Sequence, residues 1–323
     1  MTSLWRRFAD GVENPIVVKE GISRMRTWRA PVVATIYLAL IGGVGYAWLN
    51  IGAFDSYHPA AAQVGQQAFS AMTFFQLALV CLFSPALAAG AISGERERQT
   101  LDVLLVSRVT AFGIVWGKLV ASMAYVLLLV LTALPLFAAV FLFGGVDFQQ
   151  LVLTQLITVT TGLFLGSIAV FYSALFQRSL AATVTSYATT FVYAVGTALV
   201  GLIVGATESI RQASVAGPQF VVAGEWYLNP FFALASVLFP SVAPRTTLRG
   251  YLQVLFFGLP SSGSPAVGGP QVEPWAVCIS FEAVLAVAAI SAAVLLVRGR
   301  RAFGSRRRPA AALPAEAPSA EAT

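Results

Sequence analysis

Charged side chains are scarce in this sequence. Only 11% of the 323 residues are Asp, Glu, Lys or Arg, whereas 58% are hydrophobic, and the mean hydropathy is +0.79. Because soluble globular domains carry about 25% charged residues, these values exclude an ordinary soluble domain. The length is sufficient for several membrane-spanning helices of roughly 20 residues each.

Motifs for nucleotide binding and for hydrolysis are also missing. The sequence contains no G-x-x-x-x-G-K-[ST], no H-E-x-x-H and no G-x-S-x-G. It has one histidine, His58, and two cysteines, Cys81 and Cys278, which both lie in apolar runs. One histidine cannot form a zinc site alone. We therefore expect no catalytic residue, no metal site and no cofactor in this chain.

Six long apolar runs are present, and we interpret each as a membrane-spanning helix. They cover residues 31–50, 69–92, 113–143, 150–176, 181–205 and 275–297. The sequence thus predicts an all-α integral membrane protein with a spanning domain at residues 31–298. Residues 299–323, which follow the spanning domain, have the composition of a disordered tail.

Basic residues are distributed unevenly between the two ends of these spans. Seventeen of the twenty lie on the side of the termini, and only Arg211, Arg245 and Arg249 lie on the other side. Since cytoplasmic segments carry the Lys/Arg excess, both termini are predicted to be cytoplasmic. This distribution explains the net charge of +6 without nucleic acid as a partner.

The cytoplasmic N-terminus, residues 1–30, is predicted to contain an amphipathic helix at the membrane surface. Apolar side chains alternate there with charged ones that suit anionic lipid headgroups. The residues assigned to this helix are Lys19, Glu20, Arg24, Arg26, Trp28 and Arg29.

A second amphipathic helix is predicted in the cytoplasmic loop of residues 93–112. Five charged residues occur within eight positions: Glu95, Arg96, Glu97, Arg98 and Asp102. Leu101, Leu104, Leu105 and Arg108 then follow at the spacing of one helical face. Glu95 with Arg98, and Arg98 with Asp102, have the spacing of weak ion pairs within a helix.

The external segment of residues 206–274 is not a simple hydrophilic loop. It contains two apolar runs, "WYLNPFFALASVLF" and "YLQVLFFG", which are too short to cross a bilayer. We expect them to form short external helices between spans five and six.

Polar residues also occur inside the spans at helical spacing, which indicates either hydrogen bonds between helices or the lining of a substrate path. Glu282 lies about eight residues into the last span, where an ionised side chain is costly, so it is either functional or a protonated or paired structural carboxyl. The G-x-x-x-G pairs Gly162/Gly166 and Gly201/Gly205 favour close helix approach within the chain or across a dimer. We call the polar residues that would join the helices or line such a path the polar seam. The residues assigned to this seam are Thr73, Gln76, Thr158, Thr190, Tyr193 and Glu282.

Three stretches together resemble the permease subunits of type-2 ABC transporters: "NPIVVKEGISRMRTWR", "ISGERERQTLDVLLVSRVTAFGIVWGKLV" and "YLNPFF". In that family the charged run, with the "TLD-LL" and "GK" that follow, belongs to a cytoplasmic coupling helix that contacts a separate ATPase. This sequence has Gln99 where the family often has glycine. The resemblance assigns the ATPase contact to Gly94, Glu95, Arg96, Glu97, Arg98, Thr100, Leu101, Asp102, Leu104 and Leu105.

The resemblance further implies a non-catalytic permease subunit of an exporter in a bacterial inner membrane. ATP and Mg²⁺ would be bound by a partner P-loop ATPase, and a second permease subunit, identical or different, would complete the transporter. Three other hypotheses remain: an ion-coupled carrier, an intramembrane enzyme using Glu282 or His58, and a membrane scaffold of the same fold.

Overall fold

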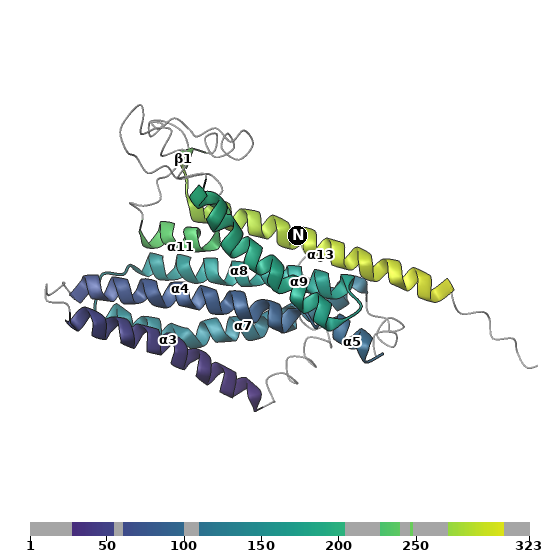
Figure 1. Ribbon diagram of the computed structural model, residues 1–323, viewed down its shortest axis with the longest axis horizontal. Coiled ribbons are helices and arrows are strands. Elements are labelled where there is room, and N and C mark those ends of the chain that lie inside the picture. The colour runs from purple at the N-terminus through teal and green to yellow at the C-terminus, as the bar shows by residue number, and fades with distance from the viewer. Residues whose placement is uncertain are drawn as a thin grey trace, which may run out of the picture.

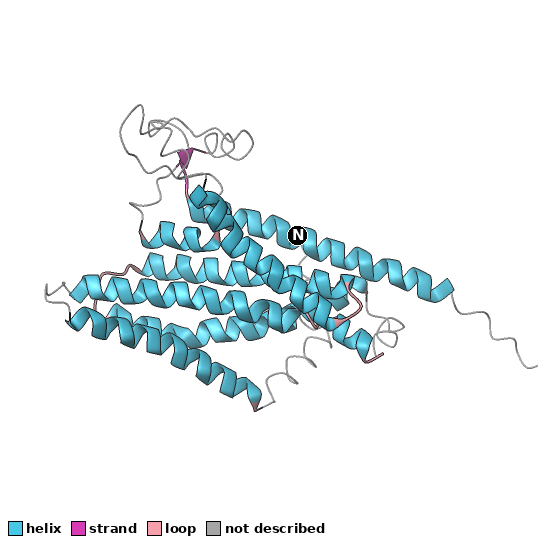
Figure 2. Cartoon of the chain, in the orientation of Figure 1, coloured by secondary structure: helices cyan, strands magenta, loops and turns pink. Residues whose placement is uncertain are grey.

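The computed structural model describes residues 28–54, 61–99, 110–203, 227–239, 246–247 and 271–306, and these are almost entirely helical (Figures 1 and 2). Five long helices form most of the bundle: α3 (Arg29–Phe54), α4 (Ala61–Ala88), α7 (Ala111–Phe141), α8 (Phe148–Leu175) and α13 (Pro274–Arg306). The remaining helix begins as α9 (Ser179–Phe191) and continues beyond it to Ile203. The shorter elements are α5 (Ser93–Glu97), the π-helix η1 (Val192–Gly196) and α11 (Pro230–Leu238). Strands β1 (Thr246–Thr247) and β2 (Gln271–Val272) pair antiparallel.

Six helical segments are long and apolar enough to cross a membrane. They are Ala30–Asn50, Ala61–Glu97, Ala111–Phe141, Phe148–Leu175, Ser179–Ile203 and Pro274–Gly299. Each overlaps one of the six predicted runs, so the predicted all-α integral membrane fold is confirmed.

Two predicted boundaries differ from the structure by eight residues or more. The second helix begins at Ala61, eight residues before the apolar run, because its first turns are rich in Ala and Gln, which favour helix without being apolar. Gln66 in this extension donates to the carbonyl of Leu238 at 3.1 Å. The last helix continues to Arg306, so the first part of the predicted tail is helical; arginine and alanine are good helix formers.

Helix α8 lies inside the bundle and contacts α4, α7, α9, α11 and α13. Close approach depends on small residues. A side chain at Gly162 would come within 2.9 Å of Val80, and one at Gly166 would meet Met123. The Ser84 hydroxyl also donates to the Gly162 carbonyl at 2.6 Å. This G-x-x-x-G pair therefore packs within the chain.

The two ends of the bundle carry different short elements (Figure 1). Helix α11, which corresponds to the first of the two predicted external runs, lies at the end where α7 leads into α8. Helix α5 lies at the opposite end, together with the turn between α8 and α9. The bundle thus brings α5 next to the ends of three spans at this end of the molecule.

Several predicted elements fall outside the described residues. These are most of the N-terminal surface helix (Lys19, Glu20, Arg24 and Arg26), His58, the loop residues Thr100, Leu101, Asp102, Leu104 and Leu105, the second external run, and residues 307–323. Of the surface-helix residues, Trp28 is 74% exposed and Arg29 begins α3.

Candidate functional site

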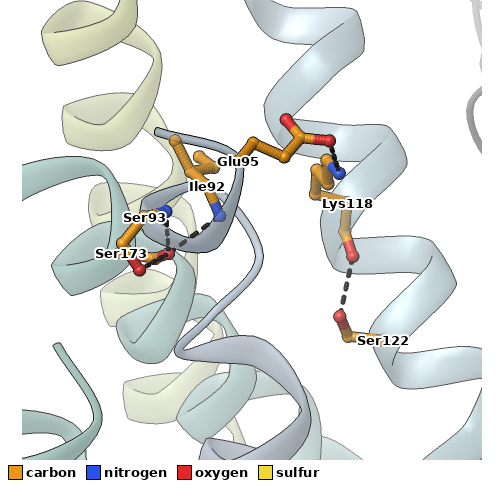
Figure 3. Close-up of polar contacts among 6 residues, drawn as sticks. All are labelled: Ile92, Ser93, Glu95, Lys118, Ser122 and Ser173. Atoms are coloured by element: carbon orange, nitrogen blue, oxygen red, sulfur yellow. Dashed lines mark hydrogen bonds and ion pairs between the residues drawn. The ribbon is translucent and has the colours of Figure 1, made fainter. Parts of the chain in front are cut away.

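The charged segment after the second span forms the short helix α5, and its first residues are bound to α8. The backbone N–H groups of Ile92 and Ser93 both donate to the Ser173 hydroxyl oxygen at 2.9 Å (Figure 3). The Ser93 and Ser173 hydroxyl oxygens are 3.1 Å apart. The first N–H groups of a helix have no partner within that helix, so Ser173 satisfies donors that would otherwise be buried and unpaired.

The next side chain, Glu95, forms an ion pair with Lys118 of α7 (Figure 3). Lys118 is only 3% exposed, and Glu95 is 24% exposed. A buried ammonium group requires a nearby negative charge because desolvation penalises the unpaired cation. The ion pair joins two parts of the sequence that carry the family resemblance, the "GERE" of the loop and the "GK" of span three. A lysine eight positions into an apolar helix is the sequence signal for such a partner.

Arg96 reaches the end of the fourth span. Its Nη1 donates to the Phe176 carbonyl at 2.6 Å and its Nη2 to the Ala174 carbonyl at 3.4 Å. The last carbonyls of a helix lack partners within it and carry partial negative charge. Arg96 therefore both satisfies and electrostatically stabilises the C-terminal end of α8.

Glu97 reaches the beginning of the fifth span. Its Oε1 accepts a hydrogen bond from the Ser179 backbone N–H at 2.8 Å, and its Oε2 accepts one from the Ser179 hydroxyl at 2.7 Å. A carboxylate beside the first N–H groups of a helix is favoured by the helix dipole. Three consecutive charged residues of α5 thus contact three different spans, and we call this arrangement the α5 junction.

The backbone forms a turn directly after α5. Gln99 has a φ of +57°, which lies in the left-handed region. A glycine adopts this conformation without steric cost, whereas other residues pay about 1–2 kcal/mol. Glutamine in place of the family's frequent glycine left open whether the backbone bends at this position, and Gln99 does adopt the left-handed conformation. Arg98, between the junction and the bend, is exposed.

The predicted seam residues are all buried, but they do not act alike. Thr73, Thr158 and Thr190 each donate to the carbonyl four residues earlier in their own helix. Hydrogen bonds between helices come instead from Gln76, which accepts from Gln155 at 3.1 Å, and from Tyr193 with Glu282. The polar stripes are therefore only partly interhelical.

Glu282 accepts two hydrogen bonds on one oxygen. The hydroxyls of Thr161 in α8 and Tyr193 in η1 donate to its Oε1 at 2.8 and 2.9 Å. Of the roles considered for Glu282, a paired carboxyl is the one with visible partners: neutral hydroxyl donors from two neighbouring helices. The described residues contain no group of three His, Cys, Asp or Glu side chains that could hold a metal ion.

Asn229 of the "YLNPFF" stretch links helix α11 to span five. Its Oδ1 accepts from the N–H groups of Phe231 and Phe232, and Pro230 occupies the first helical position, where no donor is needed. Its Nδ2 donates to the Ala194 carbonyl at 2.8 Å inside η1. Asn229 was not predicted as a site residue; the Asn-Pro pair is the N-cap signal in the sequence that identifies it.

A comparison with protein-family models places these features in one family. Residues 15–298 match the model described as "ABC-2 family transporter protein", and this range includes the α5 junction, Asn229 and Glu282. No curated protein matches the sequence. The match covers most of the chain and all six segments that can span a membrane. The chain therefore belongs to the ABC-2 family of membrane-spanning ABC transporter subunits.

Proposed function

We propose that the chain is the permease subunit of an ATP-driven exporter, in which a separate P-loop ATPase subunit binds ATP and Mg²⁺. A second permease subunit, identical or different, completes the transporter. The complex lies in the inner membrane with both termini in the cytoplasm, as the excess of basic residues at that end favours. The observation that carries this proposal is the α5 junction.

The junction suits the transmission of movement from a cytoplasmic partner to the membrane. Helix α5 follows α4 after a short turn, and its charged side chains hold Lys118 of α7, the last carbonyls of α8 and the first residue of α9. A displacement of α5 therefore acts on four spans together, because packed elements move as units and deform little.

The same contacts divide the predicted coupling residues into two groups. Glu95, Arg96 and Glu97 are engaged with their own chain, so we assign them to transmission. Arg98 is exposed, and the segment that continues from it contains five more residues to which the resemblance assigns the ATPase contact: Thr100, Leu101, Asp102, Leu104 and Leu105. We assign docking of the ATPase to Arg98 and this segment.

The proposal is tested by purifying the tagged full-length chain from gently solubilised native membranes and identifying co-purifying proteins by mass spectrometry. We expect a P-loop ATPase in roughly equal amount. The double variant Arg98→Glu/Asp102→Lys should lose most of this ATPase, whereas Arg298→Gln, a charge change at an exposed position of α13, should retain it. Absence of any P-loop ATPase under these conditions would contradict the proposed function.

A second variant separates transmission from docking. Arg96→Gln/Glu97→Gln removes the contacts with α8 and α9 but leaves Arg98 and the following segment intact. We expect normal recovery of the ATPase and a several-fold change in ATP hydrolysis by the purified complex. Loss of the ATPase in this variant would show that Arg96 and Glu97 belong to the docking surface instead.

A further inference from the structure

A buried carboxyl in the outer half of the bundle plays no part in the α5 junction. Glu282 is 1% exposed and lies eight residues after Pro274, which begins α13. At 1.5 Å per residue it is about 12 Å along the helix from the outer end. An ionised carboxylate at such a depth costs several kcal/mol unless charged partners compensate it.

The hydrogen bonds of Glu282 fit a neutral carboxylic acid. Both donors, the Thr161 and Tyr193 hydroxyls, converge on Oε1, and Oε2 has no hydrogen-bond partner among the described residues. A carboxylic acid has one carbonyl oxygen that accepts and one hydroxyl oxygen that carries the proton. The arrangement places the carbonyl at Oε1 and the proton at Oε2. A carboxylate would instead leave negative charge on an oxygen without a donor, which is costly in a buried site.

No cation compensates Glu282 from the helices packed around it. In sequence, α4, α8, η1 and α11 contain no Asp, Glu, Lys, Arg or His within their described bounds. The ionisable groups that face Glu282 are neutral when protonated: Tyr193 of η1, Cys278 of α13 and Cys81 of α4. Lys118 of α7 is engaged with Glu95 in the α5 junction.

The group that holds Glu282 is also connected to the outer helix. Tyr193 lies in η1, and its carbonyl accepts a hydrogen bond from the Thr197 hydroxyl. That hydroxyl oxygen accepts one from Asn229 Nδ2 at 2.7 Å, and Asn229 caps α11. π-Helical turns within α-helices frequently occur at functional sites because they interrupt regular hydrogen bonding. Movement of α11 can therefore change the surroundings of the Glu282 carboxyl.

We propose that Glu282 is a proton-binding site of this permease, which takes up and releases a proton on Oε2 as the outer half of the bundle changes conformation. The Thr161 and Tyr193 hydroxyls hold the carboxyl in place, and α11 controls the access of water to it. Proton binding at Glu282 does not depend on the proposed partner ATPase. The effect of the proton on transport rests on the proposed function.

Carbodiimide labelling tests the proton site directly. N,N′-Dicyclohexylcarbodiimide is apolar and reacts with protonated carboxyl groups: the acid adds across a C=N bond, and acyl transfer to nitrogen gives a stable N-acylurea without a leaving group. With the full-length chain in native membranes, we expect labelling of the peptide that contains Glu282 at acidic pH and a decline as the pH rises. A water-soluble carbodiimide should instead label Glu273, which precedes α13 and is less buried.

Variants determine whether the label reports this site. Glu282→Gln should abolish it, whereas Glu273→Gln should not affect it. Donors to a carboxyl favour the charged form, so Thr161→Val should extend labelling to higher pH. Failure to label Glu282 at any pH, or labelling that does not vary with pH, would overturn the proposal. Labelling of the unaltered chain and of Thr161→Val keeps the test decisive even if Glu282→Gln does not assemble.

A second readout distinguishes an exchanging site from a static structural acid. In the co-purified complex, the pH profile of ATP hydrolysis should be flatter for Glu282→Gln than for the unaltered protein, with Glu273→Gln as the matched control. An unchanged profile would remove the functional part of the proposal. Because labelling needs no ATPase, failure to recover an ATPase would count against the proposed function and leave the proton site intact.

Discussion

Lys118 and Glu95 form an ion pair whose two side chains are buried to different extents. Lys118 is 3% exposed and Glu95 is 24% exposed. Removing one member of a buried ion pair costs about 3–5 kcal/mol because the other charge loses its compensation. That cost falls when the remaining charge is partly solvated. Removing Glu95 and removing Lys118 should therefore lower the stability of the protein by different amounts.

We expect Glu95→Gln to destabilise the protein more than Lys118→Met does. The first variant leaves a buried cation without this counter-charge and should cost about 3–5 kcal/mol, whereas the second leaves a carboxylate that water can reach. The double variant should recover most of the loss. Thermal unfolding in detergent, followed by the fluorescence of the six tryptophans, measures all three. Equal losses that add in the double variant would contradict this interpretation of the junction.

At the scale of single elements, α11 depends on Asn229 in two ways. The side chain caps the helix through Oδ1 and holds η1 through Nδ2. Loss of a cap costs about 1 kcal/mol, and a buried carbonyl left without a donor costs about 1–3 kcal/mol. The two contributions can be separated because serine can cap a helix but cannot also reach the Ala194 carbonyl.

The expected order of stability is therefore Asn229, then Asn229→Ser, then Asn229→Ala. The serine variant should lose the contact with η1 only, and the alanine variant should lose both, with a total cost of about 2–4 kcal/mol. Thermal unfolding again provides the measurement. If serine and alanine are equally destabilising, the cap contributes nothing and the contact with η1 accounts for the whole effect.

At the scale of the whole molecule, the distribution of basic residues predicts which end of the bundle faces the cytoplasm. The α5 junction and Arg298 should lie inside the cell, and the turn that joins α7 to α8 should lie outside. Leu142 in that turn is 89% exposed and Arg298 is also exposed. The two native cysteines, Cys81 and Cys278, are buried and provide a low background.

A membrane-impermeant maleimide should label Leu142→Cys in intact spheroplasts. Arg298→Cys should react only after the membrane is permeabilised. The unaltered protein, with its two buried cysteines, is the control for both variants. The reverse pattern would place α5 on the outside and would contradict a cytoplasmic ATPase contact.

Much of the architecture could be predicted because lipid imposes a simple rule on sequence. Each spanning helix needs a long apolar run, and all six runs correspond to helices. The predicted start of span two was wrong because the polar extension at Ala61 is stabilised by helix propensity and by the contact of Gln66 with α11. An apolar window does not detect either cause.

The candidate site could be located from the sequence, but its partners could not. The charge cluster after span two predicted a short helix, and α5 is helical over Ser93–Glu97. Spacing suggested that Glu95 pairs with Arg98 in the same helix. In the structure Glu95 instead forms an ion pair with Lys118, which lies 23 residues further along the sequence. Glu97 and Ser179 are 82 residues apart. Whether the cluster contacts an ATPase remains a prediction.

The sequence by itself determined the membrane fold, the number of spans and the unusual polar positions, because hydropathy and helical period act locally along the chain. Only the tertiary structure decided which groups meet. It directed Glu95, Arg96 and Glu97 to three separate spans, and it placed the hydroxyls of Thr161 and Tyr193 on one oxygen of Glu282. The physical reason is that buried polar groups must find partners, and helix packing brings those partners from distant parts of the sequence.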